Sequence, residues 1–295
     1  MGRAIHLTDW RDIMRTAFAV TALVAAITTP AYAQPANAGL FLSVADNIGT
    51  EINGFGPFTD EDLIRTNPAG SFAEAFFAID GGDLDAFHIL PNGNYIFSSL
   101  FNGTIGATTF DDADLVEYDP NTGTVVGNYL GIGLSSFTSS APDISAATTD
   151  GDGNLYFSML GVTNTMNHAG GSLTFTDGDI VRVDATTGVA SVFVSEADIF
   201  DDGDGDVYGL HWNSDGSFLM STNEDESVSG NTFLDGDVFT YFYSSDVSNL
   251  FFSEANFSDT ANGHDIDAVF FNVPAPAGAL ALPLCALAAV RRKRF

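Results

Sequence analysis

The chain of 295 residues contains a single cysteine, Cys285, close to its C-terminus. One cysteine excludes an intrachain disulfide and every metal site built on paired cysteines. Signatures of phosphate-binding loops, dinucleotide-binding folds, serine hydrolases and zinc peptidases are also missing. The fold therefore depends on its apolar core or on bound ions for stability, and no catalytic motif suggests an activity.

Positive charge is nearly missing from the middle of the chain. Nine Lys and Arg residues stand against 39 Asp and Glu residues, which leaves a formal net charge of −30. Only Arg65 and Arg182 lie between residues 34 and 272. A body this acidic repels nucleic acid and anionic membranes, so neither is expected as its partner. The acidity has two interpretations, a solvated surface or specific binding of cations.

The first 33 residues have the pattern of a secretory signal peptide. Arginines at positions 3, 11 and 15 precede an apolar stretch at 17–27, and Ala31-Tyr32-Ala33 fits the preference for small residues at the cleavage site. We predict export and cleavage by signal peptidase after Ala33. An uncleaved anchor helix is the alternative, which the short apolar stretch disfavours.

A short motif, Phe-x-Asp-x-Asp followed by a branched aliphatic residue, occurs four times. The copies begin at Phe58, Phe110, Phe175 and Phe233. Around each copy, four short β-type segments alternate with turn signals such as Pro91-Asn-Gly-Asn94, and a polar loop is expected before each motif. Self-similarity at this spacing indicates a repeat architecture with one sheet in each unit.

The fourth repeat is divided between the two ends of the body. Residues 265–271 read as a first strand with no second strand after it, and residues 39–43 read as a second strand without a first. Joining them completes a fourth four-stranded sheet and a circular array without free edges. We therefore predict an all-β fold, a four-bladed β-propeller at residues 34–272, with a β-sandwich or another blade number as the alternative.

Residues 273–295 differ in kind from the body. They consist of Val273-Pro274-Ala275-Pro276, an apolar stretch at 277–290, and a basic end at Arg291, Arg292, Lys293 and Arg294. This segment resembles the C-terminal sorting signals of the PEP-CTERM type, and the body is similar to the propeller-like repeats of secreted proteins that carry them. The resemblance implies a short hydrophobic helix, processing by an exosortase-type enzyme, and a bacterial protein of the cell surface or extracellular matrix. Contact with the membrane is expected only through this segment, transiently in the inner membrane, and a plain C-terminal anchor is the alternative.

Strand direction predicts that the repeated aspartates gather on one face of the propeller, near the axis if the first strands are innermost. The predicted ligands are Asp83, Asp143, Asp206 and Asp265 where first strands begin, Asp85 and Asp267 two positions later, Asp62, Asp114, Asp179 and Asp237 where the motifs end, and Asp204 in an Asp-Gly-Asp-Gly-Asp run. Hard oxygen donors of this kind favour Ca²⁺ over Zn²⁺. Loop capping by aspartate side chains is the competing interpretation.

Histidines supply a second hypothesis. His88 and His211 share one register in blades expected to face each other, and His264 adjoins Asp265. A His/Asp centre would permit metal-assisted hydrolysis, but the equivalent residues of the other two blades are Thr148 and Phe270. Our first hypothesis is therefore a non-enzymatic, exported interaction scaffold with an acidic, Ca²⁺-binding face, whose partner is an extracellular polysaccharide or a surface protein. The alternative is a propeller hydrolase or lyase with a metal in its pore.

Overall fold

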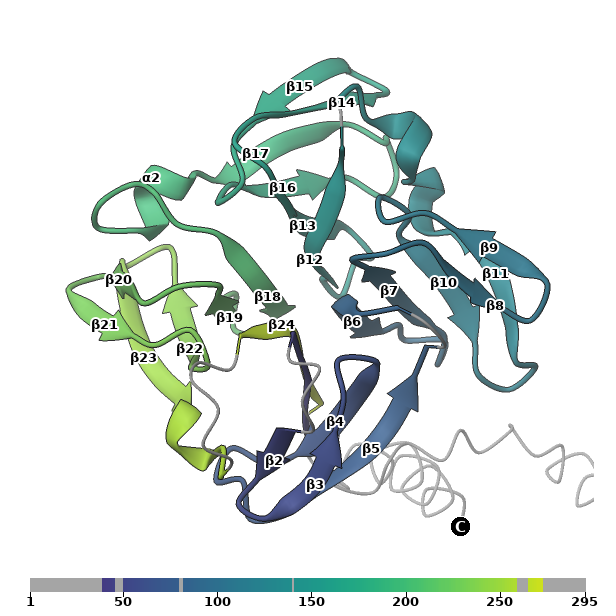
Figure 1. Cartoon of the computed structure of the whole chain (residues 1–295). Helices are drawn as coiled ribbons and strands as arrows, with labels where there is room; N and C mark the ends of the chain where they lie inside the picture. Colours follow the sequence, from purple (N-terminus) through teal and green to yellow (C-terminus); the bar gives the residue numbers. More distant parts are fainter. Residues whose placement is uncertain (1–38, 46–49, 80–81, 140, 259–264, 273–295) are drawn as a thin grey trace, which may run out of the picture. The chain divides into compact units, whose positions relative to one another are not determined.

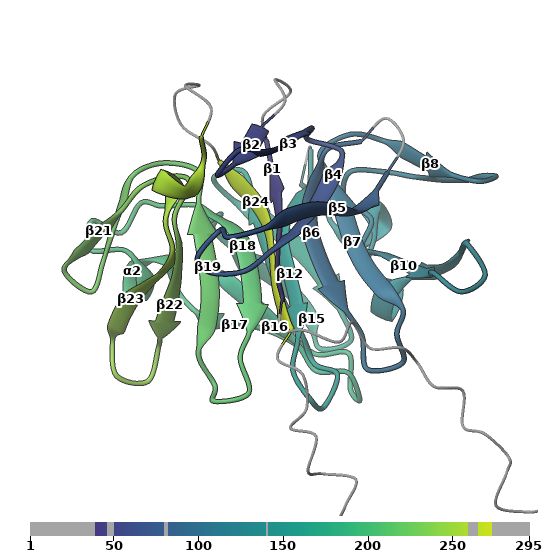
Figure 2. The ribbon, with the colours of Figure 1, turned by 90° about the horizontal axis from the view of Figure 1, so that it is seen from below.

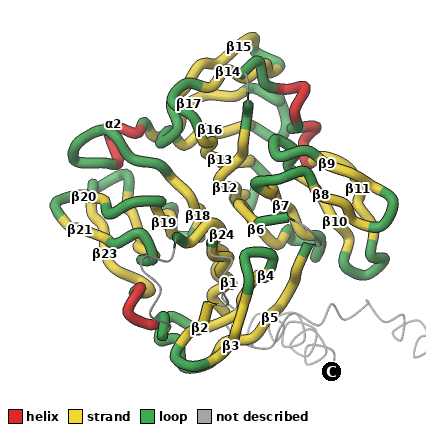
Figure 3. Tube along the Cα trace, in the orientation of Figure 1, coloured by secondary structure: helices red, strands yellow, loops and turns green. Residues whose placement is uncertain are grey.

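A computed structural model describes residues 39–45, 50–79, 82–139, 141–258 and 265–272 of the chain. Strands and turns dominate these residues, and the few helical turns are short (Figure 3). The all-β prediction is thereby confirmed. The following predictions lie outside the described residues: the signal peptide at 1–33 with Ala33, the sorting segment at 273–295 with Val273, Pro274, Pro276, Arg291 and Arg292, and His264. Within the described part, no helix is long and apolar enough to cross a membrane.

Four antiparallel sheets of four strands surround a common axis as the blades of a propeller (Figure 1). Blade 1 is β24 (Ile266–Asn272), β1 (Gly39–Val44), β4 (Asp62–Thr66) and β5 (Ala73–Ala78). Blade 2 is β6 (Leu84–Ile89), β7 (Tyr95–Ser99), β10 (Val116–Asp119) and β11 (Thr124–Asn128). Blade 3 is β12 (Asp143–Thr149), β13 (Leu155–Leu160), β16 (Ile180–Val183) and β17 (Ala190–Val194). Blade 4 is β18 (Val207–Trp212), β19 (Phe218–Thr222), β22 (Val238–Phe242) and β23 (Val247–Phe252).

The ring closes as the divided repeat predicts. Strand β24 pairs antiparallel with β1, from Gly39 opposite Asn272 to Val44 opposite Ile266. The first strands β6, β12, β18 and β24 are innermost, and each packs against the inner strands of both neighbouring blades (Figure 2). Their residues are almost all buried, which explains why these segments do not show the alternation of a half-exposed strand.

The segment between the second and third strands of each blade is a two-stranded ribbon rather than the expected loop. The four ribbons are β2 (Thr50–Ile52) with β3 (Phe55–Phe58), β8 (Gly103–Ile105) with β9 (Thr108–Phe110), β14 (Asn164–His168) with β15 (Gly171–Phe175), and β20 (Glu226–Val228) with β21 (Asn231–Phe233). The second strand of each ribbon ends at the repeated phenylalanine. Most ribbon residues are polar, so hydrophobic periodicity did not indicate them.

The core consists of four apolar clusters, one between each pair of consecutive blades. Each repeated phenylalanine is buried in the cluster that joins its own blade to the preceding one. Phe110, for example, packs with Leu63 of blade 1 and lies 5.5 Å from the Phe97 ring of its own blade. Burial of one such side chain stabilises the fold by about 1.5–3 kcal/mol. The repeated phenylalanines therefore pack between neighbouring blades.

Candidate functional site: an axial carboxylate cluster

All four inner strands carry a β-bulge at the same height. The pairing register shifts between Leu84 and Ala86 in β6, between Val207 and Gly209 in β18, and at the equivalent places in β12 and β24. The residues at the bulges are Asp85, Ser145, Tyr208 and Asp267. A bulge changes the direction of the side chain that it carries. Here it lets residues of adjoining strands meet near the axis.

Three carboxylates meet at this level. Asp83, Asp85 and Asp267 each offer an oxygen, and these oxygens all lie within 4.8 Å of one another. The three residues are only 6%, 6% and 4% exposed. One oxygen of each, Asp83 Oδ1, Asp85 Oδ2 and Asp267 Oδ2, is buried and has no hydrogen-bond partner among the described residues. Buried carboxylate oxygens are costly unless they bind a donor or a cation.

Asp143, at the start of β12, joins the group. Its half-buried side chain is close enough to Asp85 for the two carboxyl groups to share a proton, and its buried Oδ1 has no other partner in the described part of the chain. Two carboxylates cannot share such a contact unless a proton or a cation lies between them. We call Asp83, Asp85, Asp143 and Asp267 the axial cluster.

The electrostatics of the axial cluster follow from burial and mutual repulsion. Burial, followed by the charges of Asp143 and Asp267, holds the pKa of Asp85 well above its usual value. Burial, followed by the charge of Asp83, does the same to the pKa of Asp267. Both described arginines pair elsewhere, Arg65 with Glu74 at 3.0 Å and Arg182 with Asp184 at 3.4 Å.

The outer members of the axial cluster have acidic neighbours that the sequence interpretation overlooked. Burial, then the charge of Asp60, raises the pKa of Asp83 to about 7. Burial, then the charge of Asp112, raises the pKa of Asp143 to about 7. Asp60 and Asp112 are the first aspartates of their motifs, and they repeat as regularly as the second ones. The repeat itself was therefore the signal that could have identified them.

Serine hydroxyls hold the bulges of neighbouring blades in place. Ser98 Oγ donates to the Ile144 carbonyl oxygen at 2.7 Å, and Ser221 Oγ donates to the Ile266 carbonyl oxygen at 2.6 Å. Ser145, at the bulge of blade 3, donates to Val207 O at 2.9 Å. These bonds satisfy carbonyl groups beside the irregular part of the ladder and link blade 2 to blade 3, blade 3 to blade 4 and blade 4 to blade 1. The bulges of blades 3, 4 and 1 are thus each anchored to the preceding blade by a hydrogen bond at or beside the bulge.

The last aspartates of the four motifs, which the sequence predicts as ligands, cap the loops that contain them. In each copy one carboxylate oxygen accepts a hydrogen bond from the backbone N–H three residues earlier. The pairs are Asp62 with Thr59 N (3.0 Å), Asp114 with Asp111 N (3.0 Å), Asp179 with Thr176 N (2.9 Å) and Asp237 with Leu234 N (3.1 Å). The other oxygen of Asp179 accepts from Glu196 N and that of Asp237 from Glu254 N, both at 2.8 Å. All four residues therefore cap their loops, and their assignment as cation ligands stays a prediction.

The remaining predicted ligands do not join the axial cluster. Asp206 is half-buried and accepts a hydrogen bond from Asn223 Nδ2 at 3.1 Å; burial, then the charge of Asp177, raises its pKa to about 6. Asp204 is exposed, and Asp265 is half-buried. On blade 4 the bulge position is taken by Tyr208, whose pKa is raised by burial and then by Asp267. The expected four-fold set of ligands is thus replaced by an asymmetric group from blades 1, 2 and 3.

The histidines lie farther along the inner strands. The His88 and His211 rings face each other with centroids 6.0 Å apart, as their shared register predicts. Thr148 Oγ1 and Thr149 Oγ1 contact the two nitrogens of His88 at 3.1 and 2.9 Å. Burial and then His211 hold the pKa of His88 well below its usual value, and burial lowers the pKa of His211 to about 3. Both rings are therefore neutral at physiological pH.

Three residues separate His88 from Asp85 along β6, a distance of about 10 Å. Phe270 packs against both histidine rings, with ring centroids at 5.1 and 5.0 Å. Within the described part of the chain, groups that could hold a metal ion include the axial carboxylates but neither histidine. The geometry therefore separates His88 and His211 from the acidic residues that a pore-centred hydrolase would need.

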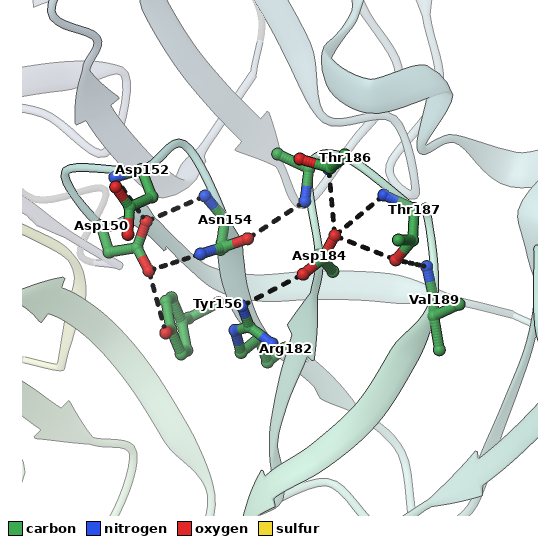
Figure 4. A network of polar contacts seen from close by, with 10 residues as sticks. Asp150, Asp152, Asn154, Tyr156, Arg182, Asp184, Thr186, Thr187 and Val189 are labelled. Atoms are coloured by element: carbon green, nitrogen blue, oxygen red, sulfur yellow. Dashed lines mark hydrogen bonds and ion pairs between the residues drawn. The ribbon is translucent and has the colours of Figure 1, made fainter.

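Acidic residues in the turns of blade 3 differ from the axial cluster, because their carboxylate oxygens accept hydrogen bonds (Figure 4). Asp150 accepts hydrogen bonds from Asp152 N, Asn154 N, Asn154 Nδ2 and Tyr156 Oη, at 2.8 to 3.1 Å. Burial raises the pKa of Asp150, but the bonds from Asn154, Asp152 and Tyr156 outweigh it, and the pKa lies below its usual value. A carboxylate that serves the fold is thus distinguishable from one with a free oxygen.

Comparisons with known proteins bear on the fold only. No protein-family model matches the chain, and no curated protein does. Among solved structures, YCF48 bound to a D1 peptide is similar at 12% identity and a TM-score of 0.32, over 65% of this chain and 48% of that one. The extracellular domain of a putative one-component system from B. thetaiotaomicron is similar at 9% identity and a TM-score of 0.33, over 80% and 36%. Virginiamycin B lyase from Staphylococcus aureus is similar at 10% identity and a TM-score of 0.32, over 72% and 69%. The chain thus spans less than half the length of the first two, and likenesses this distant carry no inference about function.

Proposed function

We propose that this protein is an exported, non-enzymatic interaction scaffold that binds Ca²⁺ through its axial cluster. The observation that carries the proposal is a group of three buried carboxylates and one half-buried carboxylate, each with one buried oxygen that lacks a hydrogen-bond partner among the described residues. Arg65 and Arg182 form ion pairs with Glu74 and Asp184, so neither balances the negative charge of the axial cluster. A proton or a bound cation can balance it. A divalent cation satisfies several oxygens at once, whereas one proton satisfies a single contact.

The donor set suits Ca²⁺ better than a transition metal. Carboxylate oxygens are hard ligands, and Ca²⁺ takes about six to eight oxygens in a flexible geometry. The axial cluster supplies four carboxylates from three blades, so further positions remain for water or for oxygen atoms of a partner. A polysaccharide hydroxyl or carboxylate, or an acidic side chain of a surface protein, has the chemistry to occupy them.

Export completes the proposal. The signal-like segment at residues 1–33 and the PEP-CTERM-like segment at 273–295 support processing by signal peptidase and an exosortase-type enzyme. Extracellular Ca²⁺ modules work with dissociation constants of about 10⁻⁴–10⁻³ M. The same cluster would thus fill after secretion, at the cell surface or in the matrix.

Terbium luminescence provides the direct test, because Tb³⁺ replaces Ca²⁺ at oxygen sites and is excited through a nearby tyrosine. Tyr208 stands close enough to Asp267 for the carboxylate to raise its pKa. We expect the full-length protein to bind Tb³⁺ with tyrosine-sensitised emission that Ca²⁺ abolishes by competition. The double variant Asp85→Asn/Asp267→Asn should lose the emission, and Asp204→Asn, an exposed aspartate outside the cluster, should keep it.

Thermal unfolding provides the second readout. A ligand at about 100 times its dissociation constant stabilises a protein by about 2.7 kcal/mol, so Ca²⁺ should raise the melting temperature relative to a chelator. Tyr208→Phe should remove the sensitised emission and leave the Ca²⁺-dependent shift intact. Absence of both the emission and the shift in the unmodified protein would overturn the proposal.

A further inference from the structure

The residues of the axial cluster are far apart in the chain, and one of them lies on the strand that completes the ring. Asp267 is on β24, the last described strand, whereas Asp83 and Asp85 are at the beginning of β6. Asp143 begins β12, in the next blade. A single ion at this position would therefore contact the closing strand and two blades to which that strand has no ladder hydrogen bonds.

Strand β24 is held in the ring by three kinds of contact. It pairs with β1 along its length, the Ile266 carbonyl accepts from Ser221 Oγ at 2.6 Å, and the Asp265 carbonyl accepts from Ala45 N at 3.0 Å. Val269 and Phe270 pack into the clusters on its two sides. None of these contacts is a hydrogen bond to β6, which is its neighbour across the junction between blades 1 and 2.

At the β24–β6 junction, the axial cluster acts against closure when no cation is present. Asp267 faces Asp83 and Asp85 with buried oxygens that lack partners within the described residues. Ionised carboxylates at this range repel one another in a buried setting; protonation relieves part of this repulsion, since the pKa values are raised, and a divalent cation between them turns it into attraction. The sign of the interaction across the junction thus depends on occupancy.

Given the Ca²⁺ site of the proposed function, we infer that the bound ion fastens the C-terminal strand β24 to blades 2 and 3 and so controls closure of the propeller ring. Closure is then linked to the Ca²⁺ concentration by mass action. The ring is tight where Ca²⁺ is abundant, as outside the cell, and opens locally at β24 where it is scarce. Elements of low local stability are the ones that open without unfolding of the whole protein, and β24 would be such an element without Ca²⁺.

Hydrogen exchange of the full-length protein tests this closure. We expect Ca²⁺ to slow exchange at the amides of β24 and of its partner β1 by at least tenfold more than at the β16–β17 pair of blade 3. Asp267→Asn should abolish this selective protection, and the exposed control Asp204→Asn should retain it. Equal protection of all blades by bound Ca²⁺ would overturn the closure inference.

Binding is measured in parallel, so that the two proposals fail in different ways. Tb³⁺ emission without selective protection of β24 leaves the Ca²⁺ site intact and removes its role in closure. Loss of both Tb³⁺ emission and Ca²⁺-dependent protection in the unmodified protein overturns the site and, with it, the closure inference.

A covalent closure supplies a rescue experiment that does not depend on the ligands. Gly39 and Asn272 are directly opposite in the β1–β24 pair. The variant Gly39→Cys/Asn272→Cys, in a Cys285→Ser background, can be oxidised to a disulfide that keeps β24 docked. The oxidised protein should bind Tb³⁺ as before and lose the Ca²⁺ dependence of β24 exchange, and the reduced protein should regain it. Undiminished Ca²⁺ dependence after oxidation would count against the inference.

Discussion

Asp85 and Asp267 occupy the same bulged position on adjoining inner strands, and each buries one carboxylate oxygen that has no hydrogen-bond partner in the described structure. The equivalent positions of the other two blades hold Ser145 and Tyr208. Ser145 uses its hydroxyl to bind Val207 O, at 2.9 Å. The backbone repeats in all four blades, but only blades 1 and 2 carry an aspartate at the bulge. The residue type at the bulge therefore decides where the acidic centre lies.

The substitution Asp85→Asn should raise stability without Ca²⁺ and remove most of the stabilisation by Ca²⁺. An amide has no charge to desolvate and relieves the repulsion by Asp143 and Asp267, so we expect a gain of about 1–3 kcal/mol in the free energy of unfolding in chelator. Urea titrations with chelator and with excess Ca²⁺ measure both quantities, with Asp204→Asn as the exposed control. An equal loss of stability in both conditions would show that Asp85 has a structural role only.

The substitution Asp179→Ala should lower stability and leave cation binding unchanged. Asp179 is 7% exposed and accepts backbone hydrogen bonds from Thr176 N and Glu196 N, so its removal leaves two donors without a partner. Hydrogen bonds to charged groups contribute about 1.5–3 kcal/mol, and we expect a loss of that order with unchanged affinity for Tb³⁺. Asp62→Ala is the milder comparison, because Asp62 is less buried and caps only its own turn, at Thr59. A weakened Tb³⁺ affinity in Asp179→Ala would return this residue to the ligand set.

The architecture was predictable because its signals are local and repeated. The motif phenylalanines mark one blade each, and the strands left over at residues 39–43 and 265–271 require a circular closure. The ribbons were missed because their strands are three to five residues long and mostly polar. Short polar strands of this kind have no apolar face for sequence periodicity to reveal.

The site was predictable only in part. Asp83, Asp85, Asp143 and Asp267 were among the expected ligands, but so were the capping residues such as Asp62, since one residue type serves both roles. The bulges depend on how an inner strand pairs with its neighbour, and the residues at them share no chemistry. One trace was present in the sequence: the position after each bulge is always Ala or Gly, at Ala86, Ala146, Gly209 and Ala268.

The substitution Gly209→Ala should strain the junction between blades 4 and 1. A Cβ at Gly209 would overlap Ser221 Oγ and Val269, and Ser221 is the donor to Ile266 O that links the two blades. Overpacking of this kind costs about 1–3 kcal/mol. Chemical denaturation measures the loss, and Gly151→Ala is the matched control, because a Cβ there meets nothing within 4 Å. Equal stability of the two variants would mean that the bulge of β18 adapts freely.

Acid should destabilise the protein through His211, and His211→Phe should reduce that sensitivity. Burial lowers the pKa of His211 to about 3 in the folded protein, against 6.5 for an ordinary histidine. The unfolded chain therefore binds more protons between these values, so the stability contributed by the neutral ring is complete above pH 6.5 and is lost as the pH falls toward 3. The slope is at most about 1.4 kcal/mol per pH unit for this one group.

Phenylalanine is a suitable replacement at position 211, because blade 1 places Phe270 at the equivalent position, 5.0 Å from the His211 ring. Urea unfolding of both proteins between pH 7.5 and pH 4 gives the comparison. The difference in stability between the two proteins at pH 7.5 reports packing alone, and the change of that difference with pH reports His211. The axial carboxylates are common to both proteins, so their titration cancels. Its sign is opposite to that of His211, because burial raises the pKa of Asp83 and Asp143. We expect the free energy of unfolding of the variant, relative to that of the wild-type protein, to rise steadily as the pH falls. Parallel stability curves would show that His211 accepts a proton in the folded state and that the axis around it admits water.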